Sequence, residues 1–227
     1  MATLVSALAF ACSRAEAPRP AASASPFPSG ENLARPLPSP VPDVVARING
    51  QDIHVAQILP LAKAELDRGS VFDRDARKPE VLRLALREYI DRELLFQEAL
   101  ARGVQADRRM VEQAYDQTRQ DHPDETQWTE FLARQGLDAQ RLKAELRANH
   151  TVAALIEQEL RALPIPEAEL RAAFEADPAA FAGSDGTASF EAARGRVEEA
   201  LRQQRRDEVR RALLERLRAR ARIETFL

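Results

Sequence analysis

The chain has 227 residues, of which 44% are hydrophobic, 30% charged and 5% aromatic, and its formal net charge is −3. This length fits one folded domain with extensions. The scarcity of aromatic residues and glycine argues against an all-β fold, and the mixture of both charge signs excludes the basic footprint of a nucleic-acid-binding protein.

The N-terminus has the features of an export signal. Residues 2–11 are a ten-residue apolar run, which suits the apolar region of a signal peptide and is too short to span a bilayer. Cys12, the only cysteine, ends a segment that resembles a bacterial lipobox. Residues 1–12 therefore predict a signal peptide with lipidation at Cys12; the alternative is an ordinary secretory signal with an incidental cysteine. Ser13, in place of aspartate, predicts anchoring to the outer membrane, on its periplasmic side.

Residues 13–43 form the next segment, which is rich in proline, alanine and serine and holds eight of the fourteen prolines. Such a composition cannot bury enough apolar area to offset its ordering entropy, and its prolines favour an extended chain. We expect a disordered linker that keeps the folded part away from a membrane.

The folded part begins with a hairpin pattern. Residues 44–48 and 51–53 are expected to be strands joined at Asn49-Gly50, which tolerates positive φ at both positions. A helical pattern runs from Val55 toward Gly69, although Pro60 predicts a late start or a kink.

Four further helices are expected before residue 164. The first has Pro79 in its first turn and two apolar stripes, which indicate a central helix. Asp107, Thr126 and Asp138 are expected to cap the next three. Pro164-Ile165-Pro166 then interrupts the helical pattern.

The remaining sequence predicts a short helix over 167–176 and a long one that Ser189 caps and that ends near Ala221. The long helix has a sparse apolar stripe that includes Leu213 and Leu217, so it must pack across the earlier helices. Residues 223–227 alternate like a strand, whose expected partner is the hairpin at 44–53. The prediction is a mainly α fold, with an N-terminal module, 44–181, completed by residues 189–227.

Several segments carry a family resemblance over about residues 44–227. They are Val45 to Ile53 (VARINGQDI), Leu86 to Ala99 (LREYIDRELLFQEA), the following Gly103-Val104, Phe174 to Phe181 (FEADPAAF) and the tail from Phe190 to Phe226. In this order they resemble the SurA/PrsA-like periplasmic chaperone family.

The resemblance implies binding of unfolded envelope proteins. In that family, parvulin prolyl-isomerase domains of about 100 residues are inserted before the last helix. Here only a seven-residue hinge, Ala182 to Ala188, stands at that point, and the chain has neither a Gly-Gly pair nor a His-Ile-Leu sequence. The resemblance thus predicts a SurA N-terminal-domain-like protein without the isomerase domain.

The expected function is a membrane-tethered, ATP-independent holding chaperone, not an enzyme. Its partners would be unfolded or partly folded envelope proteins, including those of the outer membrane. Two alternatives stay open. One is a non-catalytic interaction module of an envelope assembly or secretion complex, and the other is a residual peptidyl-prolyl isomerase.

No metal, cofactor or catalytic group is predicted. The histidines are His54, His122 and His150, and none has metal-ligand spacing to another histidine or to the cysteine. No Ser-His-Asp arrangement is visible. The carboxylates are spread among arginines, as on solvated helix faces.

Large apolar side chains are the candidate client-binding residues, because aromatic rings and adaptable methionine suit loosely specific binding. The alternative is that most of them belong to the core. Trp128 and Phe131 are expected to be the most exposed, since their helix is short and follows a polar run. The candidates are Tyr89, Phe96, Met110, Tyr115, Trp128 and Phe131.

Overall fold

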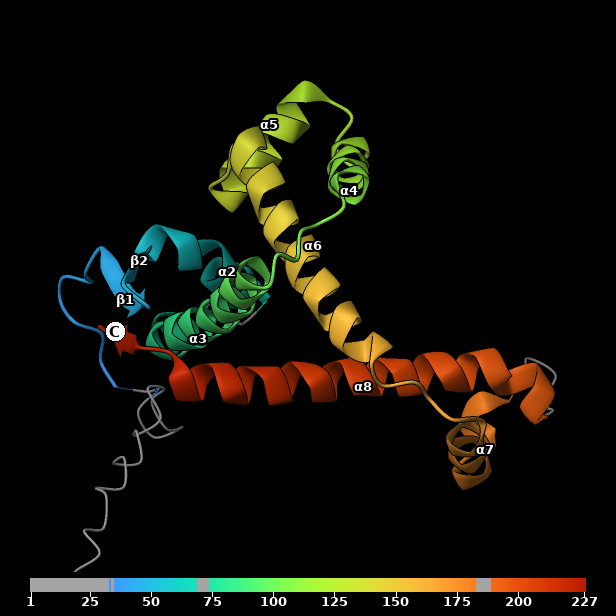
Figure 1. Ribbon diagram of the computed structural model, residues 1–227. Helices are drawn as coiled ribbons and strands as arrows, with labels where there is room; N and C mark the ends of the chain where they lie inside the picture. Colours follow the sequence, from blue (N-terminus) through green and yellow to red (C-terminus); the bar gives the residue numbers. More distant parts are fainter. Residues whose placement is uncertain (1–32, 34, 69–73, 183–188) are drawn as a thin grey trace, which may run out of the picture.

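The structure is a computed structural model that describes residues 33, 35–68, 74–182 and 189–227. The predicted signal peptide with Cys12, most of the predicted linker, Gly69 and hinge residues 183–188 lie outside the described residues. Figure 1 shows a mainly helical molecule with a small sheet beside the C-terminus. The predicted fold class is therefore confirmed.

A three-stranded antiparallel sheet joins the two ends of the described chain. Strand β1 (Val44–Ile48) lies between β2 (Gln51–His54) and β3 (Ile223–Thr225). Asn49 and Gly50 have φ values of 50° and 89°, as the tight hairpin turn requires. The register pairs Ile48 with Ile223. The predicted pairing of the C-terminal strand with the hairpin is confirmed.

Two helices follow the hairpin. Helix α2 (Val55–Arg68) begins directly after β2, and helix α3 (Arg74–Ala101) packs along it. Pro60 lies inside α2 without delaying its start, and Pro79 lies inside α3. The prediction that Pro79 lies in the first turn of this helix is wrong, because α3 begins at Arg74 and more than one helical turn precedes Pro79.

Helices α4 (Arg108–Gln120), α5 (Glu125–Gln135) and α6 (Ala139–Arg161) form the next part of the chain. Asp107 and Asp138 cap α4 and α6 as predicted. Asp124, not Thr126, caps α5, because its carboxylate accepts hydrogen bonds from the backbone N–H groups of Thr126 and Gln127. Gly136 ends α5 in the left-handed conformation, with φ 65°.

The last part contains helix α7 (Glu167–Ala176), the short 3₁₀ helix η2 (Ala179–Phe181) and the long helix α8 (Phe190–Arg220). The hydroxyl of Ser189 accepts a hydrogen bond from the N–H of Ala192, which confirms the predicted cap. In Figure 1, α8 runs from α7 at one end to the sheet at the other.

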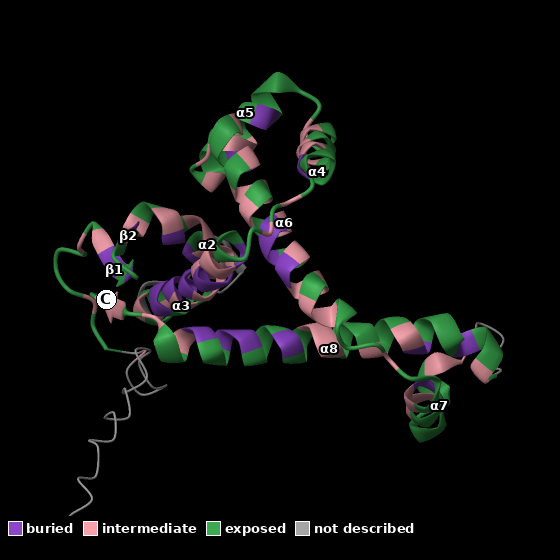
Figure 2. Cartoon of the chain, viewed as in Figure 1, coloured by how far each residue is buried: buried purple, intermediate pink, exposed green. Residues whose placement is uncertain are grey.

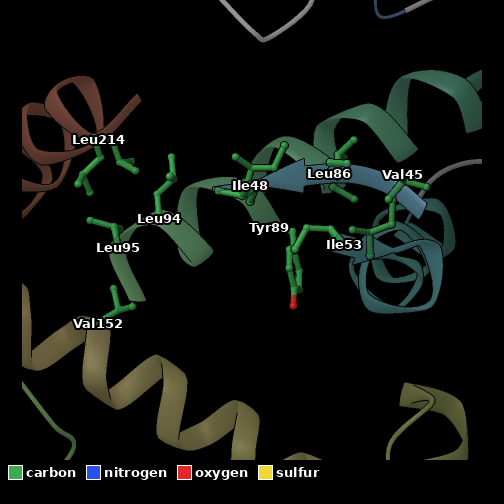
Figure 3. Packing of buried hydrophobic residues seen from close by; sticks show 14 of the residues in the cluster. Val45, Ile48, Ile53, Leu86, Tyr89, Leu94, Leu95, Val152 and Leu214 are labelled. Carbon is green, nitrogen blue, oxygen red and sulfur yellow. The ribbon is translucent and has the colours of Figure 1, made fainter. Parts of the chain in front are cut away.

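The main hydrophobic core lies where α2, α3, α6 and the C-terminal half of α8 meet the sheet. Figure 3 shows Leu94 and Leu95 of α3 between Leu214 of α8 and Val152 of α6. Leu213 and Leu217 are only 1% and 5% exposed. The long helix therefore packs back on the N-terminal helices as predicted.

Smaller apolar clusters lie away from the main core, as the scattered buried positions in Figure 2 indicate. Leu170 of α7 packs with Ala193 and Val197 near the N-terminal end of α8. Trp128, at α5, anchors an aromatic group with side chains of α4. Helix α6 joins the α4–α5 end to the main core.

Individual burial differs from the apolar pattern at two leucines. The helical pattern from Val55 predicts that Leu59 faces the core, and the apolar stripes of the central helix predict the same for Leu100, but these residues are 46% and 52% exposed. Other apolar residues of the same two helices reach the core. The apolar pattern along each helix therefore extends beyond the surface that partner helices cover. These two burial predictions are wrong.

The end of the predicted linker lies against α3. The buried Arg83 guanidinium donates hydrogen bonds to the backbone carbonyls of Leu33 (2.8 Å), Arg35 (2.6 Å) and Pro36 (3.2 Å), and Leu37 packs against the main core. Burial lowers the pKa of Arg83, and the nearby positive charge of Arg35 contributes to this shift. Docked chain therefore begins before Val44.

Candidate client-binding groove

Two adjoining hollows lie along one face of α3. The first, of about 490 Å³, lies between α2 and α3, and the second, of about 390 Å³, lies among α2, α3, α6 and α8. Leu61 and Glu88 line both hollows, so the two are continuous, and we call them together the α3 groove. Its lining residues are Pro60, Leu61, Glu65, Arg77, Glu80, Val81, Leu84, Ala85, Glu88, Arg92, Gln135, Asn149, Val152, Ala153, Ile156 and Arg210.

The α3 side of the groove follows from helical spacing. Arg77, Val81, Leu84 and Glu88 recur at intervals of three or four residues and so share one face of the helix. Val81 is buried and belongs to the main core, whereas Leu84 is 40% exposed. The groove therefore has an apolar floor continuous with the core, and apolar surface remains accessible above it.

Helices α6 and α8 provide the other wall. Val152 is buried, while Ile156 is half-buried against the core and Ala153 is exposed. One turn of α6 is held in place by Thr151, whose buried hydroxyl accepts a hydrogen bond from the N–H of Ala106 at 3.2 Å. The apolar strip on α6 is thus fixed relative to the segment that follows α3.

Ion pairs join the helices that form the groove. Arg218 of α8 contacts the Asp91 carboxylate of α3 through Nε and Nη2, at 2.9 Å and 2.6 Å from Oδ1. Arg102, directly after α3, donates to Glu159 of α6, and this hydrogen bond is the main cause of the raised pKa of Arg102. Part-buried charge-assisted contacts of this kind favour one arrangement of the helices.

The charges at the rim fall into two classes. Arg77 lies 3.5 Å from Glu65, and Arg92 lies 2.7 Å from Glu145, so these cations are paired. Glu80, Glu88 and Arg210 are exposed and make no ion pair with any described residue. The groove therefore offers unpaired carboxylates along α3 and an unpaired guanidinium from α8.

The six predicted client-binding residues do not meet in one groove. Tyr89 and Trp128 are buried, with 5% and 6% exposure, so the expectation that Trp128 is exposed is wrong. The indole of Trp128 fills the space between α4 and α5. A helix as short as α5 depends on such packing against its neighbour. Phe96 is half-buried against the main core, and Met110 is 49% exposed on α4.

An aromatic cluster gathers three of the six. The ring centroid of Trp128 lies 5.8 Å from that of Tyr115 and 5.7 Å from that of Phe131. The His122 ring stacks on Phe131, with 4.3 Å between the centroids. Of these pairs, Tyr115–Trp128 joins α4 to α5. None of the six predicted residues lines the α3 groove, and their role in client binding stays a prediction.

Tyr89 has a different position, beneath the groove. The side-chain amide of Gln57 donates a hydrogen bond to its hydroxyl at 2.6 Å, and the Arg92 guanidinium lies 4.8 Å from its ring centre. Burial raises the pKa of the Tyr89 phenol, although the charge of Arg92 opposes the shift. Tyr89 therefore supports Arg92, which does line the groove.

Sequence reasoning missed the residues that line the groove, because they come from five helices: α2, α3, α5, α6 and α8. Leu84 and Ala153 are single positions that give no motif. The available signal was the position of Leu84 three residues after Val81, on the same helical face. Its partners could not be identified without the packing of α2 and α6.

The hollow on α4 is unsuited to apolar segments. It has a volume of about 770 Å³ and is lined only by polar and charged residues, from Asp107 to Gln120. No group of acidic, histidine or cysteine residues suited to a metal ion occurs within the described ranges. His54 instead contacts Asp43, at 2.8 Å. The α3 groove, with its apolar floor, is suited to bind an extended apolar chain.

Comparison with known proteins identifies a family. Residues 33–156 match the family model of the SurA-like N-terminal domain. The matched residues include β1, β2, α2 to α5 and most of α6. Neither the curated proteins nor the solved structures provide a match. Within the described part of the chain, every helix is too short or too polar to cross a membrane.

Proposed function

Because the chain belongs to the family of SurA-like N-terminal domains, we propose that it is an ATP-independent holding chaperone that binds unfolded protein segments in the α3 groove. The family membership suggests a chaperone-like role and the binding of client proteins in a general sense. The observation that carries the proposal is the accessible apolar strip of Leu84, Leu61 and Ile156, bordered by charged side chains.

The groove suits clients that lack a folded surface. Its floor is apolar but shallow, so it can accept aliphatic or aromatic side chains from an extended segment while the client backbone stays near water. The client loses conformational entropy on binding, which limits the affinity. Weak, exchangeable binding is what holding requires, because a client must be released without an energy source.

We place the protein in the periplasm, where SurA-like domains typically act. In this proposal residues 1–12 direct export and Cys12 carries the lipid that anchors the chain to the outer membrane, as the lipobox resemblance suggests. Residues 44–181 and 189–227 act as one chaperone core. The intact mass of protein extracted from membranes tests this part, since an unmodified cysteine would contradict it.

The proposal assigns no catalytic step to the chain. The matched domain is non-catalytic by itself, and the prolyl-isomerase domain of the family has no counterpart in the sequence. Binding alone therefore explains the arrangement of the groove.

The test compares two leucines on α3. Leu84→Asp places a charge in the groove, and Leu100→Asp places one on the same helix outside it; both positions are exposed, at 40% and 52%. At several-fold molar excess the wild-type protein should delay aggregation of an unfolded outer-membrane protein. The Leu84→Asp variant should lose most of this effect and the Leu100→Asp variant should retain it.

Matched thermal unfolding of the two variants controls for folding. If the wild type fails to delay aggregation, the holding function is wrong. If both variants hold the client as the wild type does, the function stands but the α3 groove is not its site.

A further inference from the structure

We infer that the α3 groove selects client segments whose apolar middle is flanked by one basic and one acidic side chain. The inference rests on the proposed function and specifies the chemistry of its ligand. The observation behind it is the separation of unpaired charges along the groove, with carboxylates on α3 and a guanidinium on α8.

The two carboxylates have a defined spacing. Glu80 and Glu88 are eight residues apart on one helix, which places them about 12 Å apart along its axis. Leu84 lies midway between them, and all three line the first hollow. An extended chain rises about 3.3 Å per residue, so roughly four client residues span this distance.

The opposite charge lies across the second hollow. Arg210 projects from α8 into the space that Glu88, Val152 and Ile156 also line. No described carboxylate forms an ion pair with it. A client acidic side chain at Arg210 and a basic one near Glu80 or Glu88 would leave the apolar residues between them over Leu61 and Ile156.

The remaining charges of the groove do not change this preference. Arg77 and Arg92 are neutralised by Glu65 and Glu145, at 3.5 Å and 2.7 Å. A client segment with the same charge at both ends would place one of these charges beside a groove side chain of the same sign that has no described partner. Because like charges in an interface are unfavourable, such a client should bind less well than one with opposite ends.

The size of the effect follows from exposure. Ion pairs at solvent-exposed sites contribute little, so the preference should be about threefold to tenfold in Kd at low salt. It should vanish near 1 M salt, where the Debye length is about 3 Å.

The experiment uses the full-length protein and three labelled peptides with the same apolar centre. One has lysine at one end and glutamate at the other, the second has lysine at both ends, and the third has glutamate at both. Fluorescence anisotropy measures each Kd. The wild type should bind the mixed peptide most tightly.

Charge reversal supplies the decisive comparison. The Glu80→Lys/Glu88→Lys variant should prefer the peptide with two glutamates, and the Arg210→Glu variant should prefer the peptide with two lysines. These side chains are exposed, so the substitutions should leave the fold intact, which circular dichroism checks. Recovery of tight binding by the matching peptide excludes simple damage.

The outcomes separate the two proposals. If the wild type binds all three peptides equally well and the reversed variants rank them as the wild type does, charge selection is overturned and the holding function stands. If no peptide binds a wild-type protein that still delays aggregation, charge selection is overturned and the holding function stands. If that protein also fails to delay aggregation, both proposals fail.

Discussion

Tyr89 shows how a polar atom is accommodated beneath an apolar groove. Its ring is buried in the main core, and its hydroxyl accepts the hydrogen bond from Gln57. In Figure 3 its oxygen points away from the neighbouring core side chains. A buried phenolate would be costly, and for this reason burial raises the pKa of the folded-state phenol.

This pKa shift predicts a pH dependence of stability. Between the ordinary tyrosine pKa of about 10 and the higher folded value, the unfolded chain releases a proton that the folded protein retains. The wild type should therefore lose stability as pH rises above about 10. The Tyr89→Phe variant lacks this titration but loses the hydrogen bond, at a cost of about 1 kcal/mol near pH 7.

The stability difference between wild type and Tyr89→Phe should consequently shrink as pH rises above 10. Urea unfolding at pH 7 and at alkaline pH measures both free energies of unfolding. A difference that stays constant with pH would contradict the assigned role of burial.

Helix α8 belongs to two apolar clusters at once. Its C-terminal half contributes Leu213 and Leu217 to the main core, and Val197, near its N-terminal end, packs with Leu170 of α7. Between Leu201 and Val209 it has no buried residue. Over this stretch polar contacts replace apolar packing, including the ion pairs Arg205–Glu169 and Arg206–Glu157.

This separation predicts different effects for two substitutions in one helix. Leu213→Ala should lower the global free energy of unfolding by about 3 kcal/mol, because it opens a cavity in the main core. Val197→Ala should release α7 locally while the main core keeps its protection. Amide hydrogen exchange distinguishes the two: the first variant should speed exchange throughout α3, and the second should affect α7 and the adjoining turns of α8.

Equal loss of protection in α3 for both variants would show that the clusters unfold as one unit. The Leu201→Ala variant is a useful control, since Leu201 is only half-buried at the edge of the smaller cluster. Its effect should be weaker than that of Val197→Ala.

At the scale of the whole molecule, the two ends of the folded part form one sheet. Strand β3 pairs with β1, and the backbone N–H of Phe226 donates to the carbonyl of Val45 at 2.9 Å. Arg222 and Asn49 exchange further hydrogen bonds at the hairpin turn. Chain closure of this kind makes the core depend on residues far apart in the sequence.

A fragment of residues 33–160 therefore should not fold cooperatively, although it contains the whole family match. Without α8 it loses Leu213, Leu214 and Leu217, and the apolar faces of α3 and α6 become exposed. Near-ultraviolet circular dichroism and urea titration should show a broad, weak transition, with the full-length protein as the reference. A sharp transition at the full-length midpoint would show that the N-terminal module is independent of α8.

The sequence by itself determined the local elements of this protein. The turn at Asn49-Gly50 and the caps at Asp107, Asp138 and Ser189 were predictable because each depends on hydrogen bonds and φ angles within a few residues. The alternating pattern of residues 223–227 predicted a strand. Its pairing was also predictable, because the hairpin at 44–53 was the available partner.

Only the tertiary structure decided which apolar residues are covered. Trp128 is buried and Leu84 remains exposed, in each case because of the helices that happen to lie beside them. The α3 groove combines five helices, and Arg83 holds a segment that composition alone assigns to a linker. Periodicity specifies a face of a helix, but the area buried on that face depends on neighbours that are distant in sequence.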